Sequence, residues 1–311
     1  MEPNTEGILR ISGIECRYML PAALISKKGL KYVDIHGVLS LLQALSLDPV
    51  TRTWDPPNLL LSGPKGTGKS LLGAYLAELQ GLPYLSLDCT EETRERHFKG
   101  GFVAKSGETP FIFGALSNAI QVANEVGFAM LVLEEVNALS NQMQKVVNSV
   151  TDFRRKVEIP ELSLRLELAA SARLWVIATM NPVVYGGSGE LNEDLKSRFL
   201  ELEIPYPTPE QEKHILRALS PVPLNDEMER ALNFLVNIAA DTRQGNLGYS
   251  LSPRDLVEVM RLLPRVGWEE AMFLVAQKFS YEDRKVVLDR IEDRTMRRPF
   301  TTLIERAAPR H

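Results

Sequence analysis

Short apolar runs alternate with amphipathic stretches between about residues 58 and 204. Five runs have the length and composition of strands: 58–61, 84–87, 129–133, 174–178 and 200–204. The runs around positions 131 and 176 are almost wholly apolar, which is typical of strands buried on both faces of a parallel sheet. One intervening stretch repeats apolar residues at helical spacing: Met143, Val146, Val147, Val150 and Phe153. This alternation predicts an α/β fold, a three-layer αβα sandwich around a parallel sheet.

The pattern changes at Ile204, where three prolines in five residues (205–209) end a strand and begin a linker. Helical spacing dominates afterwards, in segments near 209–219, 225–240, 253–263, 268–278 and 281–292. Thr208 and Ser252, each followed by proline, are typical helix N-caps. We therefore expect an N-terminal segment (1–50) with a hairpin and one helix, a sheet domain (51–206), and a small all-α domain with a C-terminal tail (207–311).

Two segments interrupt the alternation of strands and helices. The first, about 98–109, contains glycine and lysine with Phe102 among them. The second, 156–169, includes a run from 162 to 168 that alternates apolar and polar residues, which predicts a half-exposed strand. We expect the second segment to form a β-hairpin that projects from the sheet domain.

Composition narrows the class of protein. Of 311 residues, 44% are hydrophobic and 24% charged, with a net charge of −4, which is ordinary for a globular protein and excludes a largely disordered chain or a fibrous rod. No apolar stretch approaches the length of a membrane-spanning helix. Two cysteines, Cys16 and Cys89, and four histidines exclude a disulfide framework or a zinc site of common spacing, so we expect a reducing, cytoplasmic setting.

One motif directly predicts nucleotide binding. It runs from 63 to 70 and reads Gly63-Pro64-Lys65-Gly66-Thr67-Gly68-Lys69-Ser70, with Leu71 following. This satisfies the phosphate-loop pattern and lies between a strand and a helix, as the motif requires. Backbone N–H groups would cradle the phosphates of ATP, Lys69 would neutralise the outer phosphates, and Ser70 would bind Mg²⁺.

Two carboxylates follow the apolar strand at 129–133. Glu134 and Glu135 would lie at the carboxyl edge of the sheet, where ligands bind in open α/β folds. We expect Glu134 to serve the metal ion and Glu135 to be the general base that activates water.

Three further polar residues are candidates for the same reaction. Asn181 ends the next apolar strand and could contact the γ-phosphate or the attacking water. Arg198 precedes the last strand, and Arg254 opens a helix of the second domain. Taken alone, Asn181 could belong to an ordinary Asn-Pro turn and either arginine could be a solvated surface charge, although a guanidinium suits γ-phosphate recognition.

In their order along the chain, these motifs resemble those of the AAA+ ATPases, and within them the MoxR-type branch with its CbbQ-, NorQ- and GvpN-like proteins. The resemblance covers about residues 35–292. It implies that Asn181 is sensor 1, that Arg198 is an arginine finger for the neighbouring subunit's ATP, and that Arg254 is sensor 2. It also implies a homo-oligomeric ring, usually hexameric, and identifies the two inserts as the helix-2 insert and the hairpin before the sensor strand. The family usually has Asp where this chain has Glu134, so slow turnover or an ATP-binding switch is an alternative.

Two functions of different classes are consistent with these features. The first is a chaperone-like remodeller of a protein partner, since MoxR-type relatives act with von Willebrand factor A-domain proteins or mature metalloenzymes. The second is a motor or switch subunit of a restriction- or defence-like complex acting on nucleic acid, and a non-hydrolysing scaffold is a weaker third. The acidic net charge favours the first, whereas the run Arg294-Thr295-Met296-Arg297-Arg298 keeps the second open. Lys99, Phe102 and Lys105 in the first insert could face a pore or merely cover the sheet edge.

Overall fold

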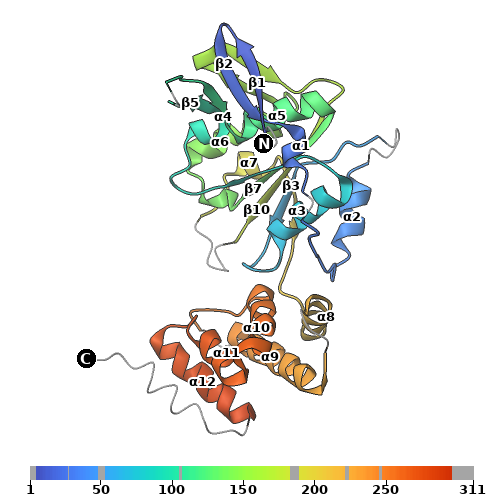
Figure 1. Ribbon diagram of the computed structural model, residues 1–311, viewed down its shortest axis with the longest axis vertical. Coiled ribbons are helices and arrows are strands. Elements are labelled where there is room, and N and C mark those ends of the chain that lie inside the picture. Colours follow the sequence, from blue (N-terminus) through green and yellow to red (C-terminus); the bar gives the residue numbers. More distant parts are fainter. Residues whose placement is uncertain are drawn as a thin grey trace, which may run out of the picture. The chain divides into compact units, whose positions relative to one another are not determined.

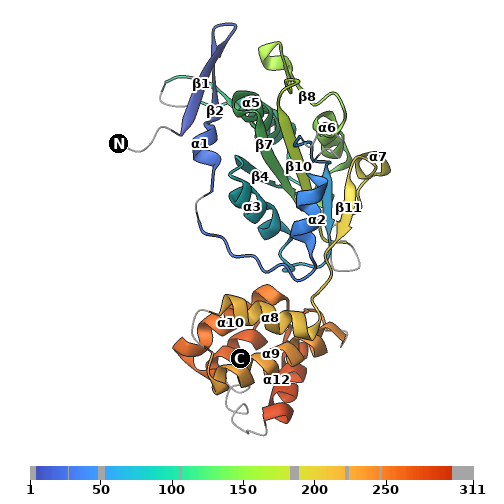
Figure 2. The same cartoon turned by 90° about the vertical axis from the view of Figure 1, so that its right-hand side faces the viewer.

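The computed structural model describes residues 5–26, 28–47, 53–104, 107–182, 189–220, 224–244 and 247–295 (Figures 1 and 2). The chain divides into two compact units. The sheet unit comprises residues 1–64 and 68–204, and the helical unit comprises residues 205–311 together with 65–67.

The sheet unit is built on five parallel strands. They are β3 (Leu59–Ser62), β4 (Tyr84–Asp88), β7 (Phe128–Glu134), β10 (Arg173–Met180) and β11 (Leu200–Glu203). Their spatial order is β11-β3-β10-β7-β4, so the phosphate-loop strand β3 lies between β10 and β11. This arrangement confirms the predicted α/β class.

Helices cover both faces of this sheet because successive residues of each buried strand point in opposite directions. Leu61, Val132 and Trp175 face a core shared with α2 (Val38–Leu45) and α3 (Lys69–Gln80), which lie over one face (Figure 2). Their chain neighbours, such as Leu131 and Val176, face a second core shared with α5 (Ala115–Val126) and α6 (Asn141–Thr151). The near-absence of polar residues in β7 and β10 follows from this double burial.

The first insert contains a strand that its sequence pattern did not predict. The helix α4 (Glu95–Lys99) leads into the insert, and β5 (Gly100–Phe102) within it pairs with β6 (Phe111–Phe113). β6 in turn pairs with β2 (Ile14–Met19), which forms a hairpin with β1 (Glu6–Ile11), giving a second sheet in the order β1-β2-β6-β5. A short helix, α1 (Pro21–Leu24), follows this hairpin. The insert is therefore tied to the N-terminal hairpin by strand pairing.

The second insert forms the predicted β-hairpin, with β8 (Lys156–Ile159) antiparallel to β9 (Leu164–Glu167) and a 3-10 turn (Pro160–Leu162) between them. One expectation about the preceding helix was wrong. α6 ends at Thr151, and Phe153 is 93% exposed instead of continuing the apolar face. Phe153 follows the C-cap Asp152, whose extended backbone stops the helical repeat before Phe153 is reached.

The helical unit contains α8 (Pro209–Leu219), α9 (Asp226–Gln244), α10 (Pro253–Val266), α11 (Trp268–Ala276) and α12 (Tyr281–Thr295) around one apolar core. Capping boxes at Thr208 and Ser252 begin α8 and α10. In the described part of the chain, no helix has the length and apolar character needed to cross a membrane.

A buried carboxylate organises the start of α10. Asp255 accepts hydrogen bonds from the backbone N–H and the hydroxyl of Ser252, from Tyr249 and from Lys278. Burial by itself raises the pKa of Asp255, but the hydrogen bonds from Lys278 and Ser252 outweigh burial and leave that pKa below its ordinary value. Asp255 is therefore a charged, fully partnered group inside the helical unit.

Candidate nucleotide-binding site

The phosphate loop leaves β3 at Gly63 and enters α3 after Gly68. Gly63 has a φ of 145°, and a Cβ atom there would lie 2.2 Å from the backbone oxygen of Ile204. Gly68 has a φ of 93° and precedes the first residue of α3. These two positions require glycine, because side chains other than hydrogen are strained at such φ angles and Gly63 has no room for one. The loop thus delivers the chain to the N-terminus of α3, where free N–H groups favour anions.

The side chain of Lys69 folds back onto the backbone of the phosphate loop. Its side chain is buried, and its Nζ donates hydrogen bonds to the backbone oxygens of Gly63 and Pro64 at 2.9 and 2.7 Å. A third hydrogen bond, of 2.9 Å, goes to Oδ1 of Asn181. Lys69 therefore connects the phosphate loop to the end of β10, placing a positive charge where both meet.

Ser70 and Glu134 lie side by side. The Ser70 hydroxyl donates a short hydrogen bond to Oε2 of Glu134, which ends β7. A hydroxyl and a carboxylate suit Mg²⁺, which takes few protein ligands and completes its shell with water and phosphate oxygens. Among the described residues, no group of three or more His, Cys, Asp or Glu side chains is arranged to hold a metal ion. The additional methylene of Glu134 does not keep its carboxylate from Ser70.

Glu135 adopts an unusual backbone conformation at the end of β7. Its φ is 53°, in the left-handed region that non-glycine residues seldom occupy. The conformation is stabilised by a hydrogen bond from the backbone N–H of Glu135 to the Thr179 hydroxyl, at 3.1 Å. It leaves the carboxylate exposed, and Nδ2 of Asn181 donates to Oε1 of Glu135 at 3.3 Å. A strained, supported residue of this kind is typical of functional positions.

One residue near the site was missed by the sequence analysis. Asn137 is buried, and its Nδ2 donates hydrogen bonds to the backbone oxygens of Asn181 at 3.0 Å and Gly189 at 3.1 Å. A Cβ atom on Gly189 would lie 2.7 Å from the Asn137 oxygen, so the two backbones pack closely. Asn137 therefore fixes the backbone of Asn181. In the sequence it is only a polar residue two positions after Glu135, and no motif marks it.

Burial and the nearby carboxylates raise the pKa of two groups beside the site. Burial, with smaller contributions from Asp88, Glu134 and Glu135, raises the pKa of Cys89 to about 12. Burial, with the charge of Glu134, raises the pKa of Tyr84 to about 12 as well. Both groups therefore remain neutral beside the acidic pair, and Cys89 is a buried thiol with no nucleophilic character at neutral pH.

Arg198 lies at the amino ends of the parallel strands, whereas the phosphate loop and the acidic pair lie at their carboxyl ends. It follows α7 (Glu193–Lys196) and precedes β11, which pairs with β3 from Leu200 opposite Leu59 to Glu203 opposite Ser62. The phosphate loop follows the other end of β3. At roughly 3.3 Å per residue, the five steps from position 58 to Gly63 span about 16 Å.

The remaining predicted residues lie elsewhere. Arg254 is exposed at the second position of α10 in the helical unit. Lys65 and Leu71 are also exposed. Lys99 forms an ion pair with Glu95 at 2.6 Å, and Phe102, 47% exposed, packs edge-on against Phe111. Lys105, Arg297 and Arg298 lie outside the described residues.

Comparison with known proteins agrees with this geometry. Residues 58–199 match the family model of the AAA domain, dynein-related subfamily. The match begins just before β3 and ends just before β11, so it spans the phosphate loop, the acidic pair, Asn181 and Arg198. Residues 58–199 are therefore similar to an AAA domain.

Relatives of similar length also exist. An uncharacterised protein of Staphylococcus epidermidis is 24% identical over 254 residues, which cover 80% of this chain and 89% of the relative. An uncharacterised protein of Staphylococcus aureus strain USA300 is 23% identical over 254 residues, which again cover 80% of this chain and 89% of the relative. Among solved structures, one described as "Structural Basis for Katanin Self-Assembly" has a TM-score of 0.47 and 17% identity, covering 79% of this chain and 74% of that one.

Proposed function

We propose that this protein binds ATP with Mg²⁺ and hydrolyses it at interfaces between copies of itself, and that it uses the cycle to remodel a protein partner, as a MoxR-type AAA+ ATPase. The observation that carries the proposal is the hydrogen-bonded chain from Lys69 through Asn181 to Glu135. It connects the loop that would hold the phosphates to the carboxylate that would activate water.

Each side chain has a distinct task in this proposal. Lys69 neutralises the outer phosphates once they displace the backbone oxygens from its ammonium group. Glu135 accepts the proton of the attacking water, and Asn181 orients both the carboxylate and the γ-phosphate. Ser70 and Glu134 would hold Mg²⁺, which supplies charge neutralisation on the phosphate oxygens when bound.

The position of Arg198 favours hydrolysis between copies. About 16 Å of strand β3 separates its edge of the sheet from the phosphate loop, more than one arginine side chain can span. Arg198 therefore cannot serve the ATP of its own chain through the sheet, whereas a neighbouring copy in a ring could receive it. Arg254 would contact the γ-phosphate as sensor 2 and move the helical unit as the nucleotide changes.

A mixing experiment tests this proposal. Glu135→Gln should bind ATP without hydrolysing it, and Arg198→Ala should lose about 10³-fold in kcat. When the two variants are mixed, Glu135→Gln subunits supply an intact Arg198 to the ATP sites of Arg198→Ala subunits. The activity of the mixture should therefore exceed the sum of the two variants measured alone. Arg165→Ala, which removes an exposed arginine from the hairpin, should keep the parent's turnover and serves as the control.

Two results would contradict the proposal. One is ATP turnover in Glu135→Gln equal to that of the parent, which would remove Glu135 as the base. The other is a protein that remains monomeric by light scattering with saturating MgATP and gains no activity on mixing. The partner class is tested with the same preparation: salt-dependent binding to DNA or RNA would favour the nucleic-acid motor, whereas ATPase stimulation by a von Willebrand factor A-domain protein or a metalloenzyme would favour the remodeller.

A further inference from the structure

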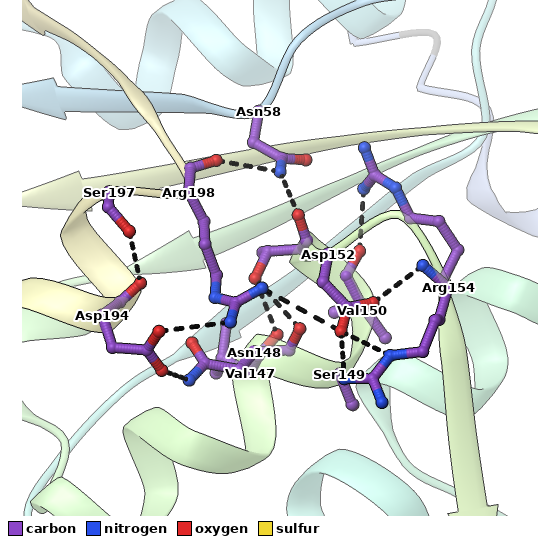
Figure 3. A network of polar contacts seen from close by, with 12 residues as sticks. Asn58, Val147, Asn148, Ser149, Val150, Asp152, Arg154, Asp194, Ser197 and Arg198 are labelled. Carbon is purple, nitrogen blue, oxygen red and sulfur yellow. Dashed lines mark hydrogen bonds and ion pairs between the residues drawn. The ribbon is translucent and has the colours of Figure 1, made fainter.

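A cluster of polar side chains surrounds Arg198 at the amino edge of the sheet (Figure 3). Its members come from three separate segments of the chain. Asn58 lies before β3, Asp152 and Arg154 follow α6, and Asp194 belongs to α7. None of these neighbours was predicted from the sequence.

The backbone of Arg198 is fixed by Asn58. This side chain is buried, and its Nδ2 donates to the backbone oxygens of Thr151 at 2.8 Å and Arg198 at 3.1 Å. The backbone N–H of Leu200 donates to the backbone oxygen of Asn58 at 2.9 Å. The end of α6 and the turn that carries Arg198 are therefore joined through a single residue at the start of the phosphate-loop strand.

The guanidinium of Arg198 lies between two unequal carboxylates. Oδ1 of Asp194 is 3.2 Å from Nη2, and the Asp194 side chain is 64% exposed. Oδ2 of Asp152 is 3.9 Å from Nη1, and the Asp152 side chain is only 6% exposed. Water and salt screen the first pair strongly, whereas the buried carboxylate keeps its attraction for the arginine.

Asp152 is itself held in place by Arg154. The backbone N–H of Arg154 donates to Oδ1 of Asp152 and its Nε donates to Oδ2, both at 2.8 Å. Burial would raise the pKa of Asp152, but the contacts with Arg154 and the charge of Arg198 outweigh it and leave that pKa below its ordinary value. Asp152 is therefore a charged group with a fixed orientation, joined through Arg154 to the base of the β8–β9 hairpin.

Arg198 nevertheless keeps an unused donor. Its Nε is shielded from solvent and has no hydrogen-bond partner among the described residues. Its side chain as a whole is 26% exposed. The cluster therefore orients the guanidinium, while the exposed part of the side chain remains open to another anion.

We propose that Asp152 is a positioning residue for Arg198, holding the guanidinium ready for a phosphate of the neighbouring copy, which takes the place of the exposed Asp194. This inference rests on the proposed function, because it assumes that Arg198 acts on another copy. Asp152 touches no phosphate itself. Its effect reaches the reaction only through Arg198.

Asp152→Asn tests the inference because it keeps the shape of the side chain and removes the charge. Turnover should fall by about 10- to 100-fold, as expected for a misplaced catalytic group. The KM for ATP should stay within about threefold of the parent, since Asp152 is remote from its own chain's phosphate loop. Asp194→Asn, at the exposed carboxylate, is the matched control and should change turnover by less than threefold.

Mixing identifies the route by which Asp152 acts. Asp152→Asn subunits retain a sound ATP site, so adding Glu135→Gln subunits, which carry an intact Arg198, should restore activity. Adding Arg198→Ala subunits should not restore it, because neither partner then supplies a well-placed arginine. A double variant, Asp152→Asn with Arg198→Ala, should be no slower than Arg198→Ala alone.

Several results would overturn the inference. They are parent-like turnover in Asp152→Asn, an equal loss in Asp194→Asn, or rescue of Asp152→Asn by Arg198→Ala. If Asp152→Asn does not fold, Asp152→Glu keeps the charge but moves it by one methylene, and it should show a smaller loss with the same mixing pattern. Failure of the Glu135→Gln and Arg198→Ala mixture would instead contradict the proposed function, so the two failures are distinguishable.

Discussion

Asn137 provides a strong test of how the site is assembled, because it contacts no predicted catalytic side chain. Asn137→Ala removes the two hydrogen bonds that it donates to the backbone oxygens of Asn181 and Gly189. At about 1 kcal/mol for each hydrogen bond, the free energy of unfolding should fall by about 2 kcal/mol. For a unit of this size, the Tm should fall by about 4–8 °C.

The catalytic consequence should be separate from this loss of stability. Without Asn137, the backbone of Asn181 loses its anchor, so its amide no longer aligns Glu135 with the water. A cost of about 1.4 kcal/mol in the transition state corresponds to a tenfold lower kcat. The dissociation constant for ATP should change by less than about threefold, because the hydrogen bonds of Asn137 go to Asn181 and Gly189 and not to the phosphate loop.

A matched control separates the two effects. Asn124 also makes two hydrogen bonds, one to the backbone oxygen of Glu167 and one from the N–H of Ala169, both at 2.8 Å. Asn124→Ala should therefore lose comparable stability in urea unfolding and keep the parent's kcat in a phosphate-release assay. The reasoning is refuted if Asn137→Ala keeps its kcat, or if Asn124→Ala loses as much.

Three further predictions concern the loop, the helical unit and the cysteines. Gly63→Ala should weaken fluorescent-nucleotide binding more than tenfold, because its Cβ would clash with Ile204, whereas Gly81→Ala, which also has positive φ but has no atom within 4 Å of the added Cβ, should bind normally. Asp255→Asn should lower the free energy of unfolding at pH 7 by about 3 kcal/mol. Because the folded pKa of Asp255 lies below its ordinary value of 3.8, its contribution is complete above that pH and lost as the pH falls below it, so urea titrations of the two proteins should converge in acid. A thiol reagent such as DTNB should leave Cys89 unlabelled at pH 8 and label it after unfolding; native labelling would contradict the burial argument.

The sequence alone predicted the parts of the candidate nucleotide site that are local in the chain. The phosphate loop is contiguous, and Glu134, Glu135 and Asn181 each end an apolar strand. Because parallel strands end at the same edge of a sheet, the hydrophobic pattern was enough to predict that these residues would meet. The alternation of apolar and polar residues likewise predicted the β8–β9 hairpin.

Only the tertiary structure revealed the residues that hold these groups in place. Asn137 and Asn58 act by donating to backbone oxygens of residues 44 to 140 positions away, and nothing in their local pattern marks them. The strand β5 in the first insert likewise belongs to a sheet that includes distant residues, because its partner β6 pairs with β2. Hydrophobic periodicity reports which face of an element is buried, whereas long-range hydrogen bonds depend on the order of strands in the sheet, which forms only when the whole unit folds.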